Sequence, residues 1–291
     1  RRACRPFAEN CGFTIAESAQ MVVLFDDQLA MELGATVFAA ATDVFVNADG
    51  HKKSISGPGV GNYITMAKAV AAARAVVGEK ALRTAGMVQA HGTGTIQNRI
   101  TESRIISETA KAFGIEKWPV AAMKSYLGHT LGSASGDQIT STLGIWRHGW
   151  VPGIHSIDEV AEDVNQDRLQ LSPDHQQTDT ESLQYSIINS KGFGGNNATA
   201  TILSPTVARR MLQMRYSGTE WTAWQHANEA VRERQQQYDD DMIAGKRMPI
   251  YKFDHGVLGD DDVQMDAHEL RIADKKVVLD LESPYDDMRI D

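Results

Sequence analysis

Three short apolar segments of this chain each run directly into a loop rich in small residues, and this arrangement constrains the fold most. Residues 87–90 lead into the sequence H-G-T-G-T that starts at His91, and residues 119–123 lead into a loop that contains His129. Residues 185–188 lead into G-F-G-G, centred on Phe193. Glycine lets a backbone approach a substrate closely. A histidine at a strand's end can point into a cleft that neighbouring amides also face, so the three junctions predict one site built from several strand ends.

Each loop also has an ordinary explanation when it is taken singly. A His-Gly pair is usually a turn, and a histidine alone is weak evidence of catalysis. A lone glycine-rich loop is weak evidence of phosphate binding, and the chain has neither G-x-x-x-x-G-K-[ST] nor G-x-G-x-x-G after a strand. The three loops in this order are far more specific than any one of them.

Strands alternate with helices along the chain, and a hairpin across the third loop closes the series. This order predicts an α/β fold with a mixed sheet layered with helices. The expected strands cover residues 13–15, 21–25, 36–46, 87–90, 119–123, 185–189 and 198–203. The expected helices cover residues 27–33, 62–77 (ending at Gly78), 101–114, 134–147, 207–216 and 220–238.

Charge divides the chain unevenly. Residues 237–291 hold 15 Asp and Glu against 7 Lys and Arg, which is −8 of the formal net charge of −9. We therefore predict a body over residues 1–205 and a mostly helical, acidic extension over residues 206–291. The acidity argues against nucleic acid as a partner. Trp221 and Trp224, three residues apart, are expected to pack the extension's helix onto the body.

The remaining composition indicates a cytoplasmic protein. No run reaches the roughly 20 apolar residues of a membrane span, and the first residues lack the apolar core of a signal peptide. Two cysteines, Cys4 and Cys11, cannot form a disulfide framework. No metal or organic cofactor is expected.

Four motifs occur in a family-specific order between residues 5 and 203. They are Arg5-Pro6-Phe7 with Gly12-Phe13 and Glu17; His91 to Thr95 with Glu102; Lys124-Ser125 with Gly128-His129 and Gly132; and Asn189-Ser190 with Gly192 to Gly195 and Asn197. Together they resemble the C-terminal half of β-ketoacyl-[acyl-carrier-protein] synthases, condensing enzymes of the thiolase fold. The C-terminal addition and the residues around 98–101 and 192–197 are most similar to the FabY-type branch.

The resemblance implies a decarboxylative Claisen condensation in fatty acid synthesis. A cysteine thiolate takes an acyl group from a thioester, a malonyl thioester loses carbon dioxide, and the resulting carbanion attacks the acyl-cysteine. His91 and His129 would be neutral imidazoles that donate to the enolate oxygen. Lys124 would be a supporting cation, or alternatively the ion-pair partner of Glu102, which is expected to support the site structurally. The N–H of Phe193 would line the oxyanion hole, with Gly192, Gly194, Thr93 and Thr95 in the substrate-binding loops.

Several positions depart from the family pattern. The family's nucleophile lies upstream of Arg5-Pro6-Phe7, and Cys4 and Cys11 are poor replacements because neither begins a long helix that would lower its pKa. Arg99 stands where relatives usually carry Asp, and Lys191 replaces a common Phe. Gln138 stands where many relatives carry Glu, which puts any Lys–Glu pairing there in doubt.

These departures predict an incomplete enzyme, inactive as this chain alone. The expected partners are the missing N-terminal half or a second polypeptide, an acyl carrier protein, acyl and malonyl thioesters (with acetyl-CoA as one candidate primer), and a second copy in a homodimer. Three alternatives stay open: a non-catalytic partner of the chain-length-factor type, a polyketide ketosynthase and a thiolase. The retained histidines favour a synthase over a scaffold, and two histidines favour it over a thiolase.

Overall fold

The computed structural model describes residues 4–9, 12–50, 58–248, 250, 253 and 255–290. The chain forms two compact units, Arg1–Arg234 and Gln235–Asp291. Most of the secondary structure lies in the first unit, which also contains every residue of the predicted site.

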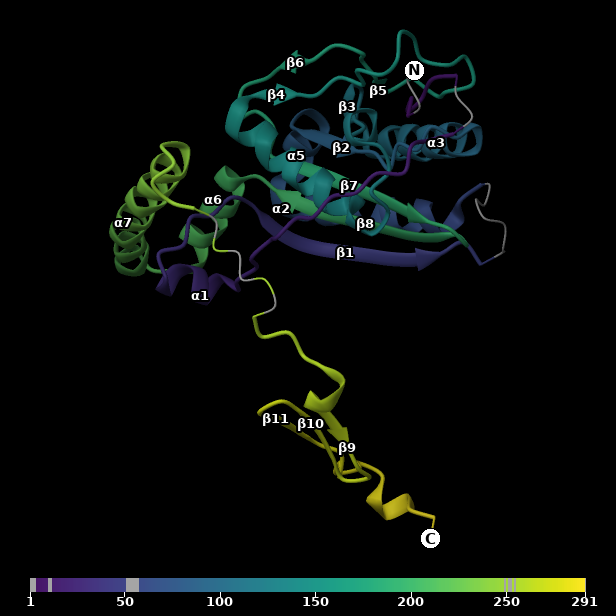
Figure 1. Cartoon of the computed structure of the whole chain (residues 1–291). Coiled ribbons are helices and arrows are strands. Elements are labelled where there is room, and N and C mark those ends of the chain that lie inside the picture. Colours follow the sequence, from purple (N-terminus) through teal and green to yellow (C-terminus); the bar gives the residue numbers. More distant parts are fainter. Residues whose placement is uncertain are drawn as a thin grey trace. The chain divides into compact units, whose positions relative to one another are not determined.

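A six-stranded mixed sheet, in the order β1-β8-β7-β2-β3-β5, forms the centre of the first unit (Figure 1). β2, β3, β5 and β7 are parallel where they pair, whereas β8 is antiparallel to both β7 and β1. The expected α/β fold with a mixed sheet is thus confirmed. The strands are β1 (Ala40–Ala48), β2 (Gly86–Gln89), β3 (Trp118–Ala121), β5 (Leu169–Gln170), β7 (Tyr185–Gly192) and β8 (Asn196–Leu203); β4 (Trp150–Val151) and β6 (Gln176–Gln177) form a separate pair.

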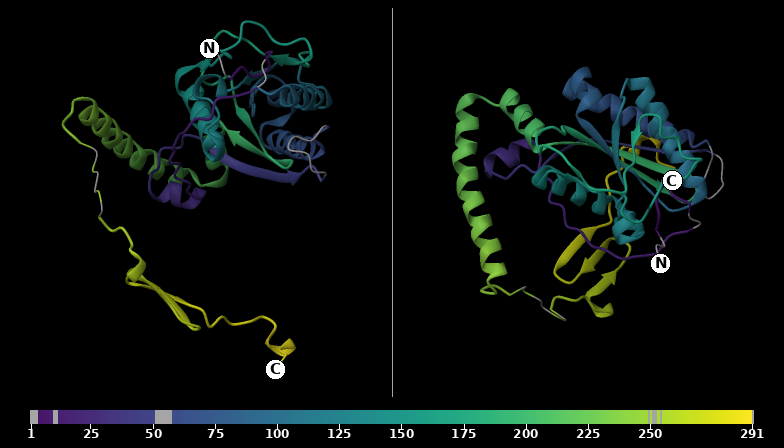
Figure 2. Two further views of the ribbon diagram at one scale, coloured as in Figure 1. Left: turned by 45° about the vertical axis from the view of Figure 1, so that its right-hand side comes forward. Right: turned by 90° about the horizontal axis from the view of Figure 1, so that it is seen from above.

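Helices cover both faces of the sheet (Figure 2). α2 (Val60–Thr84) and α3 (Ile96–Phe113) pack on one face through a cluster that includes Met66, Ile105 and Trp118. α5 (Ala134–His148) packs on the other face, where Trp146 and its neighbours contact the sheet. Because β2, β3 and β7 are parallel neighbours, their carboxyl ends share one edge, and the three predicted loops leave from it.

The segment before the sheet differs from the sequence prediction. The strands expected over residues 13–15 and 21–25 do not form; Ile15 makes a single bridge to His129, and residues 21–25 are exposed. Their apolar side chains favour a strand, but no described segment pairs with them. The short helix after them is confirmed as α1 (Asp27–Glu32), with the side chain of Asp26 accepting the N–H of Leu29.

Two helices begin earlier than predicted. α3 starts at Ile96 after the cap residue Thr95, so Thr101 lies buried within the helix instead of capping it. α2 starts at Val60 and continues past Gly78, which bends it with φ 78° and ψ 167°. Residues 48–61 hold Asp49-Gly50 and Ser56-Gly57-Pro58-Gly59, which predict a loop, and residues 51–57 of this segment lie outside the described residues. No described helix is both long and apolar enough to cross a membrane.

Two helices follow the sheet: α6 (Pro205–Arg215) and α7 (Gly218–Ile243). Trp224 is buried with Met31 and Leu212, and it stacks on Trp221 with ring centroids 4.6 Å apart, so the predicted packing of the two tryptophans is confirmed. Beyond α7 the extension forms mainly strands and loops, whereas the sequence predicts a mostly helical extension. β9 (Val263–Met265), β10 (Glu269–Ile272) and β11 (Lys275–Val278) form an antiparallel sheet, because apolar residues alternate there around a turn at Ala273, whose φ is 51°.

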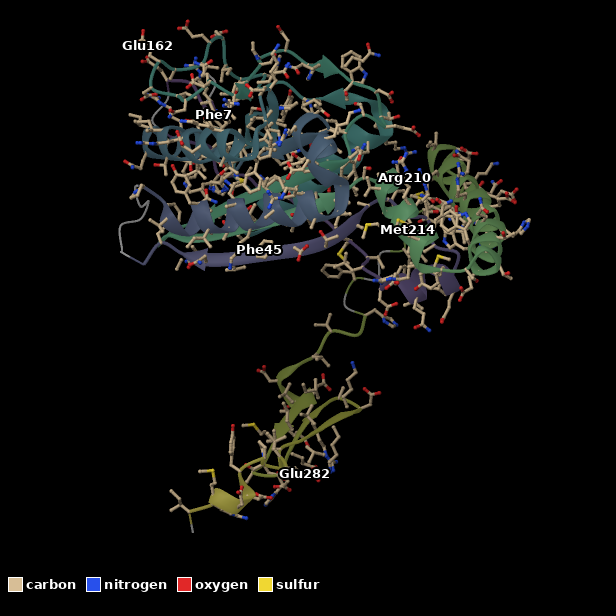
Figure 3. All side chains as sticks on the ribbon, turned by 180° about the vertical axis from the view of Figure 1, so that it is seen from behind. Phe7, Phe45, Glu162, Arg210, Met214 and Glu282 are labelled. Atoms are coloured by element: carbon tan, nitrogen blue, oxygen red, sulfur yellow. The ribbon has the colours of Figure 1, made fainter. Side chains whose placement is uncertain are left out.

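The second unit has no described residue that is buried. Figure 3 shows the side chains of the β9–β11 sheet and of the segment after it, which contains Glu282. A sheet of three short strands with two exposed faces has little apolar area removed from water.

Candidate active site

The carboxyl ends of β2 and β3 bring the two predicted histidines together. His91 follows β2, and His129 follows the short helix α4 (Lys124–Leu127) after β3. Their ring centroids are 5.5 Å apart, with the ring planes at 80°. Both side chains are buried, 7% and 8% exposed. The sequence therefore predicted correctly that these two loops meet.

Hydrogen bonds from the backbone determine which ring nitrogen of each histidine carries the proton. The N–H of Leu131 donates to Nδ1 of His129 (3.1 Å), and the N–H of Lys191 donates to Nδ1 of His91 (3.3 Å). Leu131 has a φ of 57°, which is uncommon for a residue other than glycine. A neutral imidazole that accepts at Nδ1 donates at Nε2. Both rings are therefore Nε2–H donors.

The two imidazoles are neutral at pH 7. Burial holds the pKa of His91 well below its usual 6.5, and electrostatic interactions with Lys124, His129 and Lys191 lower it further. Burial, together with Lys124, lowers the pKa of His129 to about 4. A pair of neutral N–H donors can stabilise an oxygen atom that gains negative charge during a reaction.

Lys124 supports the first histidine loop. Its ammonium donates to the main-chain oxygen of His91 and lies 3.5 Å from Nδ1 of the same residue. Burial lowers the pKa of Lys124 to about 8, so it remains mostly protonated at pH 7. No salt bridge joins Lys124 to Glu102 among the described residues, although the charge of Glu102 raises the pKa of Lys124 against the effect of burial.

Glu102 is a fully buried carboxylate on α3 that ties three segments together. It accepts the N–H groups of His91 (2.7 Å) and Gly92 (2.9 Å). It also accepts the side-chain amides of Asn98 (2.9 Å) and Asn189 (2.7 Å). Glu102 therefore fixes the start of the first histidine loop against α3 and β7, in agreement with its predicted structural role.

The family comparisons agree with this arrangement of loops. The family described as "Beta-ketoacyl synthase, C-terminal domain" matches residues 38–158. FabY of Pseudomonas aeruginosa, named a beta-ketoacyl-[acyl-carrier-protein] synthase, is 48% identical over 272 residues, which are 94% of this chain and 43% of FabY. This chain contains the C-terminal domain of a β-ketoacyl synthase. The thiolase-like fold follows from the same matches.

The likeness to FabY extends through the C-terminal extension of this chain. The crystal structure of the ketosynthase FabY from P. aeruginosa superimposes with a TM-score of 0.83 at 46% identity, over 99% of this chain and 45% of that chain. The 3-oxoacyl-[acyl-carrier-protein] synthase 2 of Vibrio cholerae is 30% identical over 201 residues, which are 68% of this chain and 46% of that enzyme. The chain thus spans less than half the length of these relatives.

In this chain, a segment near the N-terminus holds the second histidine loop in place. The N–H of His129 donates to the oxygen of Thr14 (2.7 Å), and the ring of Phe13 lies 5.1 Å from that of His129. Asp137, in the first turn of α5, accepts the hydroxyl groups of Thr130 (2.5 Å) and Ser18 (2.7 Å). Sequence reasoning missed Asp137, although an acidic residue in the first turn after a histidine loop was a usable signal.

The third predicted loop of this chain is the turn between β7 and β8. Gly194 and Gly195 have φ values of 85° and 79°, which glycine adopts without strain, and the side chain of Phe193 is 67% exposed. Thr93 is buried, and its hydroxyl lies 3.5 Å from that of Thr95. The structure thus places Gly192 and Phe193 directly after Lys191, whose N–H contacts His91.

Two of the three positions that depart from the family pattern, Gln138 and Arg99, have side-chain hydrogen-bond partners. Gln138 donates its amide to the main-chain oxygens of Gln89, Ala90 and Asn189, which precede the first and third loops. Arg99 forms a two-bond pair with Asp163 at 2.8 Å. Within the described residues, neither side chain forms a hydrogen bond to a histidine ring. Both residues therefore stabilise the structure around the site.

The two cysteines differ in what the structure describes. Cys4 is buried, and burial raises the pKa of its thiol, although Lys124 and the backbone of Gly94 act in the opposite direction. A thiol with a raised pKa is a weak nucleophile. Cys11 lies outside the described residues.

Proposed function

We propose that this chain is the histidine-bearing half of a β-ketoacyl-[acyl-carrier-protein] synthase. The complete enzyme would condense an acyl thioester with a malonyl thioester carried by acyl carrier protein, with loss of carbon dioxide. The observation that carries the proposal is the pair of buried, neutral imidazoles whose Nδ1 atoms both accept backbone N–H groups.

The proposed chemistry uses the Nε2–H groups of the two histidines as hydrogen-bond donors. When the carbon dioxide leaves, the electron pair of the broken bond passes into the thioester and forms an enolate. His91 and His129 donate their Nε2–H groups to the enolate oxygen, and Lys124 holds the loop of His91 in place. The carbanion then attacks the carbonyl carbon of the acyl-cysteine, and the N–H of Phe193 donates to the oxygen of that second thioester. The C–S bond breaks as the new C–C bond is completed, and the cysteine leaves as its thiolate. The neutral forms matter because a neutral donor stabilises the enolate without transferring a full proton.

A second part of the enzyme completes this site in our proposal, and it supplies the cysteine nucleophile. The relatives are more than twice the length of the match, and Cys4 is a poor nucleophile. The first unit also exposes apolar side chains that another surface would cover, and these include Ile15, Met21, Val23, Leu24, Phe38, Val44 and Val46. The homodimer and the cytoplasmic location remain predictions.

The test is malonyl-thioester decarboxylation by the complete protein. We expect His91→Ala and His129→Ala each to lower the rate by about 10² to 10³, the usual cost of one lost donor to a developing oxyanion. His226→Ala is the matched control, since His226 lies exposed on α7. Full activity in either site variant would overturn the proposal, and a complete protein without decarboxylation would favour the scaffold alternative.

A further inference from the structure

Lys191, near the end of β7, has a buried ammonium that the proposed chemistry does not use. Its Nζ atom has no hydrogen-bond partner in the part of the chain that the structure describes. Lysine is rarely buried without a partner. Burial lowers the pKa of Lys191, while the carboxylates of Glu102 and Asp49 act in the opposite direction. The charge of this side chain is therefore held near the site at an energetic cost.

The alternation of β7 determines which side of the sheet Lys191 enters. Ser190 faces α5, where its hydroxyl contacts Ser135 (2.8 Å) and Gln138 (3.2 Å). Asn189 faces the opposite side, where it contacts Glu102 (2.7 Å). Successive side chains of a strand point to opposite faces. The side chain of Lys191 therefore lies on the same face of the sheet as Glu102. The main-chain N–H of Lys191 contacts His91, so this side chain lies close to the His91 loop.

The neighbouring strand offers a matching acceptor. Asn197 lies opposite Lys191 in the register of β7 and β8. Its amide nitrogen donates to three oxygens, those of Asn47 (3.3 Å), Asp49 (3.0 Å) and Gly195 (3.0 Å). Because all three are acceptors, the amide orientation is determined, and Oδ1 is left buried with no partner among the described residues. The ammonium of Lys191 and Oδ1 of Asn197 are thus a donor and an acceptor on the same strand pair that are both buried without a hydrogen bond among the described residues.

We propose that Lys191 is a positioning residue of the two-histidine site: its main-chain N–H selects the Nε2–H form of His91, and its buried, unpartnered ammonium places a positive charge on the Glu102 side of the same loop, which disfavours a second charge on that ring. The inference rests on the proposed function, in which His91 donates as a neutral ring. Lys191 does not contact the substrate in this scheme, since its side chain lies on the Glu102 side of the sheet.

The charged groups around His91 set the sign of the effect. Lys124 and Lys191 disfavour a second positive charge on the ring, and Glu102, which holds the N–H of His91, favours it. His129 is neutral at pH 7, Cys4 and Asp137 act on Lys124, and Asp49 acts on Lys191. Removing the charge of Lys191 should therefore raise the pKa of His91. It should leave the tautomer unchanged, because the N–H belongs to the backbone.

The experiment follows the imidazole nitrogens by ¹⁵N NMR across a pH titration of the complete protein, with His91 and His129 assigned from His→Gln variants. In Lys191→Met we expect His91 to titrate at higher pH, whereas Lys191→Arg, which keeps the charge, restores the original position. His129 is the internal reference, since Lys191 does not contribute to its shift. Lys111→Met, at an exposed position on α3, is the matched control.

Two results would overturn the inference. One is an unchanged His91 titration in Lys191→Met, and the other is an equal shift of both histidines, which indicates general loosening. If Lys191→Met does not fold, Lys191→Gln replaces it, because glutamine removes the charge and keeps a polar side chain with a hydrogen-bond donor.

Activity provides a second readout of the same variants. The decarboxylation rate of Lys191→Met should fall more steeply on acidification than that of the parent protein, and Lys191→Arg should reverse this. If the complete protein does not decarboxylate malonyl thioesters, the proposed function fails, while the NMR titration still decides the role of Lys191.

Discussion

At the scale of single residues, Glu102 shows how a carboxylate outside the chemistry can determine a site. It is fully buried and accepts four N–H groups, two from the His91 loop and two from asparagine side chains. Charge-assisted hydrogen bonds of this kind are roughly twice as strong as neutral ones. The position of His91 therefore depends on the charge of a residue on another element.

Replacing Glu102 by glutamine keeps the shape and removes the charge. The new NH₂ group would face N–H donors, so at least one buried donor loses its acceptor, at a cost of about 1–3 kcal/mol each. We expect Glu102→Gln to lower the free energy of unfolding by about 2–4 kcal/mol in chemical denaturation. Glu108→Gln, at an exposed position on the same helix, should change it by less than about 0.5 kcal/mol. Equal stability of the two variants would contradict the role of Glu102.

The pH dependence of decarboxylation belongs to the same scale. Burial lowers the pKa of His129 to about 4 and that of Lys124 to about 8. Histidine becomes charged only below its pKa and lysine loses its charge above it, so the active form exists between these values. We expect a level rate from about pH 5 to 7 and a fall above about 8 in single-turnover assays of the complete protein. Lys124→Arg should move that fall to higher pH, and an acid limb near 6.5 would contradict the burial of the histidines.

At the scale of elements, α2 contains a bend at Gly78. Gly78 has φ 78° and ψ 167° inside the helix, a conformation that is strained for any residue with a Cβ atom. The sequence predicted a helix end at this glycine, because glycine commonly follows the last helical turn. The chain instead resumes the helix to Thr84, which packs Leu82 into the core.

Two glycines in helices form a matched pair for testing this bend. We expect Gly78→Ala to lower the free energy of unfolding by about 1–2 kcal/mol, since alanine is disfavoured at positive φ. Gly144→Ala in α5, where no atom lies within 4 Å of the added methyl group, should raise it by about 0.5–1 kcal/mol. Thermal unfolding of both variants measures the difference, and destabilisation by both or by neither would contradict the assignment.

The sequence predicted elements well where local pattern and tertiary pairing agree. β7 and β8 alternate around a glycine turn, and each finds its partner in the other, so the hairpin formed as expected. Residues 21–25 have an equally apolar pattern but no partner strand among the described residues, and they remain extended and exposed. A strand needs a neighbour to satisfy its backbone groups, and a single sequence does not say where that neighbour lies.

The candidate site was predictable where glycine and histidine mark a loop. His91 and His129 could be placed from strand ends, and Lys124 and Glu102 from the family motifs that contain them. The roles of Asp137 and Lys191 were missed, because their contacts join residues 100 or more positions apart in sequence: Asp137 accepts the hydroxyl of Ser18, and the backbone N–H of Lys191 donates to His91. Such pairs become visible only when the sheet brings the segments together.

At the scale of the whole molecule, the C-terminal extension combines a packed part and an exposed part. The sequence predicts that the extension begins at residue 206, whereas the compact units divide after Arg234. The reason for the difference is Trp224, which is 6% exposed, contacts the cluster of Met31 and Leu212, and donates its ring N–H to the oxygen of Ala35 (3.2 Å). The first half of α7 therefore belongs energetically to the body.

Truncation of the complete protein separates these two parts. Ending the chain after Arg234 removes residues of which none described is buried, so we expect the midpoint of thermal unfolding to stay within about 2 °C. Ending it after Ser217 removes Trp221 and Trp224 and uncovers Met31, which should lower the free energy of unfolding by about 3–5 kcal/mol, as does deletion of a large buried aromatic side chain. Trp224→Ala should reproduce most of that loss, while Trp150→Ala, at a position 48% exposed, should not. If truncation after Arg234 were as harmful as truncation after Ser217, residues 235–291 would have to be part of the folded body, and a division after Arg234 would no longer describe the molecule.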